Sequence, residues 1–380
     1  MIRLIKSRLI AMVSRLWNPS FSWARCSWFE KSLFLFLCLC EYGYRLGFNL
    51  AMRYKRWRGG KRFDFPIISV GNISVGGTGK SVFVSFLVDQ LGPERVAVVL
   101  RGYKGSGKTM IVSDGLCVRC SATACGDEAM MYVLHYPNLR VAVGKNRARA
   151  CALLEQGVCN APQRLACVLL DDAYQNFDVK PSLNIILLDA RFPFENGHCL
   201  PAGRLRELDC SRAEFIVITH ADAIGSESLV GLKNLLARKV PGVTVLAGKH
   251  GARGLWEDNL HLMSSAMLVN RRLLVAAGVG SFDGVVQTVR ACGATITATH
   301  AFGDHFNYKP SDITDLCLLA AQQQCTGIVV TEKDWVKVNP LLQKDVALHG
   351  QVSWYVIRVG FEFLSAREYD CLIKAIQQVI

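Results

Sequence analysis

The sequence predicts an α/β protein in which two α/β/α sandwich domains follow an N-terminal helical arm. Its 380 residues suffice for two such domains of ordinary size. An apolar strand, a glycine-rich loop and a helix occupy residues 65–91, and strands alternate with helices again from residue 273. This alternation is typical of parallel sheets covered by helices. We expect an arm at 1–62, a first domain at 63–250 and a second domain at 251–380.

The arm carries most of the net charge. Residues 1–62 contain 13 Lys or Arg and two acidic residues, so they hold 13 − 2 = +11 of the total of +13. A nucleic-acid-binding protein is expected to carry basic residues on its folded body as well, which argues against nucleic acid as a partner. An arm that is both basic and apolar is typical of a segment at an anionic membrane surface.

Two stretches of the arm have helical character. The first is marked by apolar residues at helical spacing, namely Ile2, Ile5, Leu9, Met12, Val13 and Leu16. The second, Leu33–Met52, is apolar but is interrupted by Glu41 and Arg45, whereas a membrane-spanning helix needs about 20 apolar residues. We interpret the arm as a monotopic anchor in the membrane interface. The alternatives are a spanning helix through Leu33–Met52 and a buried pair of helices; a signal peptide is disfavoured because no cleavage site of small residues follows.

The 15 cysteines are odd in number and scattered, and many lie in apolar runs, which fits a reducing cytoplasm. Cys117, Cys120 and Cys125 form a C-x2-C-x4-C cluster. A single C-x2-C without a distant matching pair is weak support for zinc, so ordinary thiols are the simpler interpretation.

Two loops compete for the role of a phosphate-binding loop. Gly102–Thr109 fits the pattern G-x4-G-K-[ST] to the letter, whereas Ser74–Ser81 has a serine at the first glycine position. Such a loop must follow a buried strand and open a helix whose N-terminus faces the phosphates. Only Ser74–Ser81 has this context, with the apolar strand Phe65–Val70 before it and the helix Ser81–Leu91 after it. Residues 110–115, which follow the other loop, predict a strand and a turn.

The accepted loop predicts ATP and Mg2+ as cofactors and a P-loop NTPase-like sheet for the first domain. Its glycines let the backbone wrap phosphate oxygens, Lys80 contacts the β- and γ-phosphates, and the Ser81 hydroxyl ligates Mg2+. The predicted nucleotide-binding residues are Ser74, Val75, Gly76, Gly77, Thr78, Gly79, Lys80 and Ser81.

Several acidic residues stand at the ends of predicted elements. Asp171 and Asp172 end the apolar strand 164–170, which is where a magnesium-binding carboxylate sits in P-loop proteins. Asp127 opens a helix, as a cap or as a functional group. Asp304 and His305 are adjacent, which suits proton transfer or a structural contact.

The second domain is indicated by the strands Leu273–Ala277 and Ile328–Val330 and by a helix at Phe282–Cys292. Gly248–Asn259 is rich in glycine and charge, and we interpret it as a hinge between the domains, near 248–262.

Together these motifs resemble the tetraacyldisaccharide 4′-kinase family. The series that carries the resemblance is Val70-Gly71-Asn72 before Ser74–Ser81; Arg101-Gly102-Tyr103; Gly126-Asp127-Glu128; Val143-Gly144 with Arg147; Asp171-Asp172 with Gln175; Asp189; Asn196-Gly197 and Leu200–Glu207; His300-Ala301-Phe302 with Asp304-His305 and Tyr308; and Thr331-Glu332-Lys333-Asp334. Each motif is weak alone, but their order and spacing are specific.

The resemblance implies transfer of the γ-phosphate of ATP to the 4′-hydroxyl of a tetraacylated glucosamine disaccharide 1-phosphate, which gives lipid IVA in lipid A biosynthesis. It implies two α/β domains with nucleotide and lipid near their cleft, at the cytoplasmic face of the bacterial inner membrane. The partners are then the lipid substrate and the membrane surface, and no protein partner is indicated. The basic residues that suit an acidic lipid or the substrate's 1-phosphate are Arg53, Lys55, Arg56, Arg58, Lys61 and Arg62.

By the same resemblance, Asp127 is the catalytic base and His305, paired with Asp304, assists it. Lys80 and Arg206 complete the catalytic set, and the implied metal ligands are Ser81, Asp171, Asp172 and Glu207. The chain departs from the family pattern at Leu100, Ala173, Asn176, Gly303 and Phe306, without losing an expected Asp, Lys or Arg.

A P-loop NTPase that works as a switch or metal chaperone is the main alternative. An inactive relative that only binds lipid is disfavoured by the presence of Lys80, Asp127 and Asp172.

Overall fold

The computed structural model describes residues 12–18, 26–103, 105–158, 164–257, 261–303, 306–344 and 352–380. Internal contacts divide the chain into two compact units. The first unit takes Met1–Lys80, Leu170–Lys249 and Phe363–Ile380, and the second takes Ser81–Leu169 and His250–Glu362. Both units are built from separate stretches, whereas the predicted domains 1–62, 63–250 and 251–380 are continuous, so those boundaries stay a prediction.

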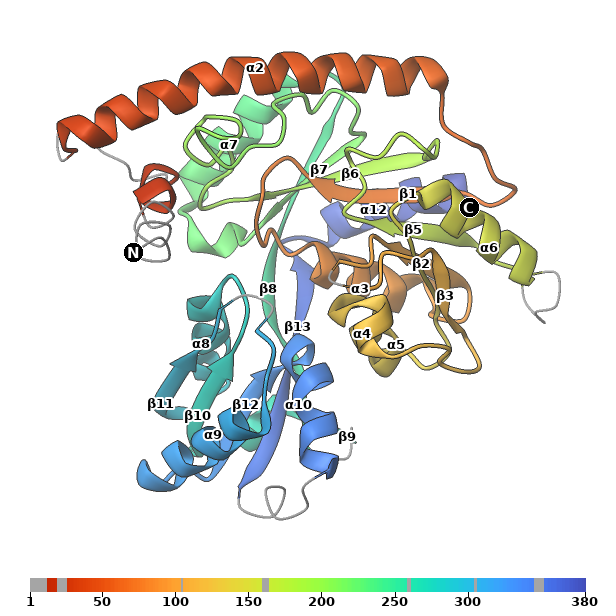
Figure 1. Ribbon diagram of the computed structural model, residues 1–380. Coiled ribbons are helices and arrows are strands. Elements are labelled where there is room, and N and C mark those ends of the chain that lie inside the picture. Colours follow the sequence, from red (N-terminus) through yellow and green to blue (C-terminus); the bar gives the residue numbers. More distant parts are fainter. Residues whose placement is uncertain are drawn as a thin grey trace. The chain divides into compact units, whose positions relative to one another are not determined.

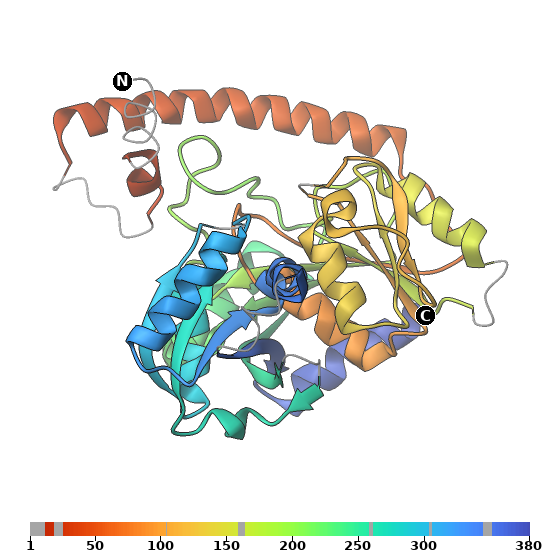
Figure 2. The same ribbon diagram turned by 60° about the horizontal axis from the view of Figure 1, so that its bottom comes forward.

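The arm contains one long helix, α2 (Trp28–Arg58), which is unbroken in both views (Figures 1 and 2). A capping box begins it: the Glu30 N–H donates to Ser27 Oγ at 3.2 Å, and the Ser27 N–H donates to Glu30 Oε2 at 2.9 Å. Basic residues in the last turn favour its C-terminal end. Of the predicted helix at 2–16, residues 12–16 are described and are helical, and the rest lies outside the described residues.

Helix α2 has two different faces. Phe34 and Glu41 are buried, whereas large apolar side chains are exposed along the opposite side. We call these the exposed apolar face of α2; they are Trp28, Phe29, Leu35, Phe36, Leu39, Tyr42, Leu46, Leu50, Tyr54 and Trp57. None of the helices within the described ranges is both long and apolar enough to cross a membrane.

The first unit is built on parallel strands. β1 (Ile67–Asn72) pairs with β6 (Leu183–Asp189), β6 with β7 (Phe215–Thr219), and β7 with the first residues of β8 (Thr244–Glu257). Every residue of β1 and β7 is buried, which explains their continuous apolar sequences. Helix α7 (Ser226–Lys239) packs on β6 and β7 through Leu236, and α12 (Ala366–Val379) buries Leu372 and Ile376. The predicted α/β class is confirmed.

One part of the second unit follows the glycine-rich loop. Helix α3 (Lys80–Leu91) leads to β2 (Val96–Leu100), which pairs in parallel with β4 (Arg140–Val143), and β3 (Met110–Asp114) pairs antiparallel with β4. The helices of this part are α4 (Ala122–Cys125), α5 (Asp127–His135) and α6 (Arg147–Val158). Strand β5 (Cys167–Asp171) begins in this unit and ends in the first.

The other part of the second unit is a parallel sheet with helices on both faces. β10 (Arg272–Ala277) pairs with β11 (Thr295–Ala301) and β12 (Gly327–Thr331), and β12 pairs with β13 (Ser353–Phe363). Alternate residues point to opposite faces: Leu274 and Ala276 pack with α9 (Pro310–Gln322) and α10 (Glu332–Lys344), while Leu273 and Val275 pack with α8 (Phe282–Ala291). The predicted second set of parallel strands is confirmed.

The segment predicted as a hinge is extended strand as far as it is described. β8 runs through Gly248–Glu257; Thr244–Ala247 pair with β7, and Leu255–Glu257 pair antiparallel with β9 (His261–Met263). Glycine and charge did not prevent a strand because backbone pairing, rather than composition, holds it extended. The division between the units falls at Lys249 and His250, inside this strand. A hinge function of the segment stays a prediction.

Candidate active site

The glycine-rich loop lies between a buried strand and a helix, as predicted. β1 ends at Asn72, and α3 begins at Lys80 with Ser81 as its second residue. Gly76 (φ 147°) and Gly79 (φ 80°) have backbone conformations that L side chains rarely adopt. This arrangement points the first N–H groups of a helix toward the loop, which is the geometry of a phosphate site.

Arg204, which lies far from this loop in the sequence, is hydrogen-bonded to its backbone. The Val75 N–H donates to the Arg204 carbonyl at 2.7 Å, and Arg204 Nε donates back to the Val75 carbonyl at 3.0 Å. A Cβ at Gly76 would lie 2.8 Å from Arg204 Nη2, so glycine lets the guanidinium approach. The sequence placed Arg204 within a family motif but gave no reason to assign it this contact, because it lies 129 residues from Val75.

Side chains below the loop also fix its shape. Buried Asn72 donates from Nδ2 to Thr78 Oγ1 at 3.0 Å, and Thr219 at the end of β7 donates to the Thr78 carbonyl at 3.2 Å. Residues at the ends of β1 and β7 therefore hold Thr78 in place. This fixes the loop two residues before Lys80, where α3 begins.

The paired aspartates meet the loop lysine. β5 ends at the buried Asp171, and Asp172 turns the chain with a left-handed φ of 50°. Lys80 Nζ lies 3.6 Å from Asp172 Oδ1, and Arg206 Nη1 donates to the same oxygen at 2.9 Å. The structure thus brings together three of the predicted site residues, Lys80, Asp172 and Arg206.

Glu207 lies in a second network beside Arg206. Its carboxylate accepts from Arg212 Nη2 at 2.9 Å and from Gln175 Nε2 at 2.8 Å. Burial raises the pKa of Glu207, and the Arg212 guanidinium opposes this shift. Among the described residues Asp171, Asp172 and Glu207 do not form one cluster of converging ligand atoms, so a shared metal role for the three stays a prediction.

Asp189, at the end of β6, is held by a different pair of groups. Arg191 donates to it from Nε at 2.9 Å and from Nη2 at 2.6 Å, and His220 Nδ1 lies 3.3 Å away. Burial alone would raise the pKa of Asp189, but the hydrogen bonds from Arg191 and the nearby His220 ring outweigh it and lower the pKa well below its usual value. This carboxylate therefore anchors the turn after β6 as an anion.

In the second unit, Asp127 opens helix α5 and makes an ion pair with α10. Lys337 Nζ lies 3.0 Å from Asp127 Oδ2 and donates to the Phe306 carbonyl at 2.8 Å. The Lys337 side chain is only 9% exposed. Lys337 lies three positions after the family motif Thr331–Asp334, so none of the sequence motifs included it. The predicted Asp304 and His305 lie outside the described residues.

The motif Thr331–Asp334 forms a buried hydrogen-bond network at the start of α10. The fully buried Asp334 accepts from Thr331 Oγ1 at 2.6 Å, Tyr308 Oη at 3.0 Å and the Gly278 N–H at 3.1 Å. It therefore joins the turn after β10 to α10, and supports the helix from which Lys337 reaches Asp127.

The competing loop Gly102–Thr109 leads into strand β3, as predicted, and not into a helix. Of the nearby cysteines, Cys117 is exposed and Cys125 is buried. Burial raises the pKa of the Cys125 thiol to about 12, with a contribution from Cys120. The described residues do not bring these three sulfurs together with a further ligand as a metal cluster.

The fold and the loop at Lys80 define a P-loop protein of the α/β class. Within this class the chain belongs to the tetraacyldisaccharide-1-P 4′-kinase (LpxK) family, whose model matches residues 33–378. The chain is therefore a kinase, and the resemblance inferred from its motifs is confirmed.

Individual relatives agree with the family match. The chain is 35% identical over 292 residues to tetraacyldisaccharide 4′-kinase of Geobacter metallireducens, which covers 75% of this chain and 82% of the relative. It is 30% identical over 325 residues to the enzyme of Anaeromyxobacter dehalogenans strain 2CP-1, with coverage of 84% and 83%. The fold matches the crystal structure of LpxK from Aquifex aeolicus in complex with ATP, with a TM-score of 0.69 and 23% identity over 90% of this chain and 99% of that one.

Proposed function

We propose that this kinase transfers the γ-phosphate of ATP to the 4′-hydroxyl of tetraacyldisaccharide 1-phosphate and so produces lipid IVA, a precursor of lipid A. The observation that carries the proposal is the Lys80 loop, with Asp172 and Arg206 at its lysine, in a chain of this kinase family. A loop of this kind binds nucleotide phosphates. The identity of the phosphate acceptor is inferred from the family to which the chain belongs.

The residues present fit ATP with Mg2+. Magnesium is usually held by one or two carboxylates together with substrate phosphates and water, so it does not need a cluster of three acids. The Ser81 hydroxyl and a carboxylate of Asp171 or Asp172 are suitable donors, with Glu207 as a predicted further ligand. The bound ion would neutralise charge on the phosphates. Lys80 would bind the β- and γ-phosphate oxygens, and Arg206 orients Asp172.

Asp127 is the proposed base. In the transfer, the 4′-oxygen forms a bond to the γ-phosphorus, the bond from that phosphorus to the β–γ bridging oxygen breaks, and ADP leaves. The hydroxyl proton passes to the Asp127 carboxylate. Lys337 Nζ lies 3.0 Å from this carboxylate at the N-terminus of α5 and so positions it. His305, paired with Asp304, is the predicted assistant.

The acceptor is a lipid, so we propose that the enzyme works at the cytoplasmic face of the bacterial inner membrane. The exposed apolar face of α2 supports this location, because aromatic and aliphatic side chains on one side of a basic helix suit the interface. A pocket of about 370 Å³ lies beside the same helix. Its cationic lining residues, which suit an anionic headgroup or the substrate's 1-phosphate, are Arg45, Arg53, Arg56, Arg206 and Arg212.

The test is a transfer assay with the full chain in detergent, radiolabelled ATP, Mg2+ and tetraacyldisaccharide 1-phosphate. We expect labelled lipid, and we expect Asp127→Asn to lose transfer by at least about a hundredfold while it still binds ATP. ATP hydrolysis without lipid phosphorylation would reject the proposal and favour a P-loop switch. Full activity of Asp127→Asn would reject its role as base.

A further inference from the structure

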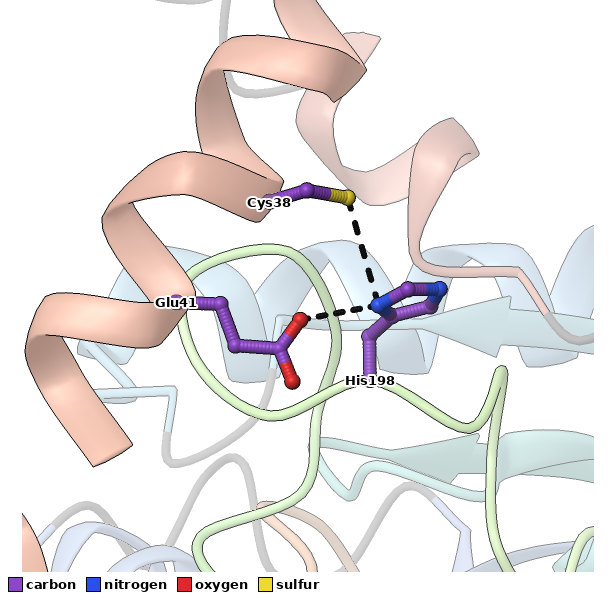
Figure 3. A group of neighbouring side chains, drawn as sticks. All are labelled: Cys38, Glu41 and His198. Carbon is purple, nitrogen blue, oxygen red and sulfur yellow. Dashed lines mark hydrogen bonds and ion pairs between the residues drawn. The ribbon is translucent and has the colours of Figure 1, made fainter. Parts of the chain in front are cut away.

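A sulfur, a nitrogen and an oxygen donor converge where α2 meets the loop after β6. Cys38 and Glu41 lie on α2, His198 lies on the loop, and one ligand atom from each lies within 4.8 Å of the others (Figure 3). Within the described residues this is the one group of three His, Cys, Asp or Glu side chains that meets this distance. None of the three belongs to the ATP site.

The separations are close to those of a bound cation. Cys38 Sγ lies 4.0 Å from His198 Nδ1, and Glu41 Oε2 lies 2.8 Å from the same nitrogen. In a tetrahedral site with bonds of about 2.0–2.3 Å, neighbouring donors are about 3.3–3.6 Å apart. The two distances to His198 Nδ1 lie about half an ångström on either side of this range, and the third pair, Cys38 Sγ and the Glu41 carboxylate, lies within 4.8 Å.

The fold holds the three donors in this arrangement. Cys38 and Glu41 are three residues apart and so share one face of α2. The Cys199 N–H donates to Glu41 Oε1 at 2.9 Å, which leaves Oε2 directed at the imidazole. The His198 ring packs edge-on against Phe34, with centroids 5.2 Å apart. Ligands fixed by such outer contacts lose little freedom when a metal binds.

The donor set selects the kind of ion. Thiolate, imidazole and carboxylate together suit Zn2+, whereas Mg2+ prefers oxygen donors alone. Glu41 is nearly buried, but the His198 side chain is 38% exposed, so solvent can reach the group and a water can take a fourth position. We propose that Cys38, Glu41 and His198 form a Zn2+ site that fastens α2 to the loop after β6. Zinc would displace the proton of the Cys38 thiol.

The site would have a structural consequence for the enzyme. The loop of His198 continues into Arg204, which is hydrogen-bonded to the glycine-rich loop, and into Arg206, which contacts Asp172. A cation that joins α2 to this loop would fix the helix that carries the exposed apolar face onto the segment that supports the nucleotide loop. Both belong to the first unit.

The arrangement also permits a simpler reading, an ion pair of Glu41 and His198. The pair does not use Cys38, so a sulfur ligand distinguishes the two. The experiment uses the metal-free full chain in detergent, without nucleotide, titrated with Co2+ and then with Zn2+. We expect one equivalent of Co2+ to give visible bands and a thiolate-to-cobalt charge-transfer band, and Zn2+ to displace it.

Variants assign the band. Cys38→Ser should abolish it, and His198→Gln should weaken Co2+ binding by at least about tenfold. Cys371→Ser, at an exposed cysteine of α12, and the double variant Cys117→Ser with Cys120→Ser should keep it. X-ray absorption of the zinc-loaded wild-type chain should show one sulfur ligand, a readout that does not depend on how the variants fold. Absence of sulfur at the zinc, or a band that survives in Cys38→Ser, would overturn the proposal.

Discussion

Lys337 illustrates how one buried cation can set the chemistry of a site. Its ammonium contacts Asp127 Oδ2 and the Phe306 carbonyl and lies 5.9 Å from the centre of the Tyr308 ring. A lysine that is 9% exposed needs such partners because desolvation disfavours its charge. Since Asp127 is the proposed base, the charge of Lys337 bears directly on how readily Asp127 releases a proton.

We therefore expect Lys337→Met to lower kcat/KM for lipid phosphorylation roughly tenfold to a hundredfold and to move the acid limb of the pH–rate profile to higher pH. Without the cation, the Asp127 carboxylate binds a proton more readily. Lys337→Arg should restore most of the profile. Lys333→Met is the matched control, because Lys333 lies 3.9 Å from Glu128 rather than at Asp127. An unchanged pH profile in Lys337→Met would show that Lys337 only packs.

Asp189 predicts a pH dependence of stability. Its folded pKa is lowered by Arg191 and His220 against the effect of burial, so the carboxylate stabilises the fold above its unfolded pKa of about 3.9. This contribution is lost as the pH falls through that value toward the folded pKa. Asp189→Asn should cost roughly 1–3 kcal/mol of unfolding free energy at pH 7 and clearly less near pH 2, where the pH has fallen well below the unfolded pKa.

Denaturant unfolding at the two pH values measures this difference. Asp370→Asn, at an exposed position of α12, controls for the loss of one negative charge. A cost of Asp189→Asn that is equal at both pH values would mean that packing, rather than ionisation, stabilises this turn.

At the scale of elements, the strands were predictable where burial is continuous. β1, β5 and β7 are buried along their whole lengths and appear in the sequence as unbroken apolar runs. The helix after the glycine-rich loop was predictable from the same apolar pattern. Strand β8 was not, because its glycines and charges are held in a strand by its neighbour β13, with β7 paired at one end and β9 at the other.

Helix α2 shows the limit of local patterns. Because Glu41 interrupts an apolar run, the sequence predicted that this segment lies in the membrane interface. A membrane-spanning helix was the alternative. In the structure Glu41 is buried and is hydrogen-bonded to His198 and to the backbone of Cys199. These partners lie 157 and 158 residues further along the chain. No window of the sequence contains these partners, so neither the burial of Glu41 nor the cluster with Cys38 could be predicted.

At the scale of the whole molecule, several motifs that identified the family occupy a strand end or helix start, as at Lys80, Asp127, Asp171 and Asp189, where chemistry is placed in α/β proteins. The sequence did not predict the contacts of supporting residues such as Arg204 and Lys337. Arg204 acts through its backbone and guanidinium on Val75, and Lys337 acts across two helices. Such roles depend on tertiary packing, which single motifs do not encode.

The proposed association with a membrane surface depends on how charge is distributed over the whole molecule, in which the arm holds +11 of the net charge of +13. On α2, Leu35, Leu39, Tyr42 and Leu46 are exposed at spacings of three or four residues, so they form one continuous side. We expect the full chain to bind vesicles that contain anionic lipid, and to bind them less as salt is raised, because basic residues contribute through a screened attraction.

Leu39→Glu combined with Leu46→Glu should reduce vesicle binding at least about tenfold, because each change removes apolar contact and adds repulsion from anionic lipid. Sedimentation with vesicles measures the bound fraction. The control is Val230→Glu on α7, a position that is 57% exposed and outside this face. Transfer to a detergent-dispersed lipid should persist in the double variant, since neither leucine lines the arginine-rich pocket. Equal vesicle binding by the double variant and the control would show that charge alone, and not the exposed apolar face of α2, holds this enzyme at the membrane.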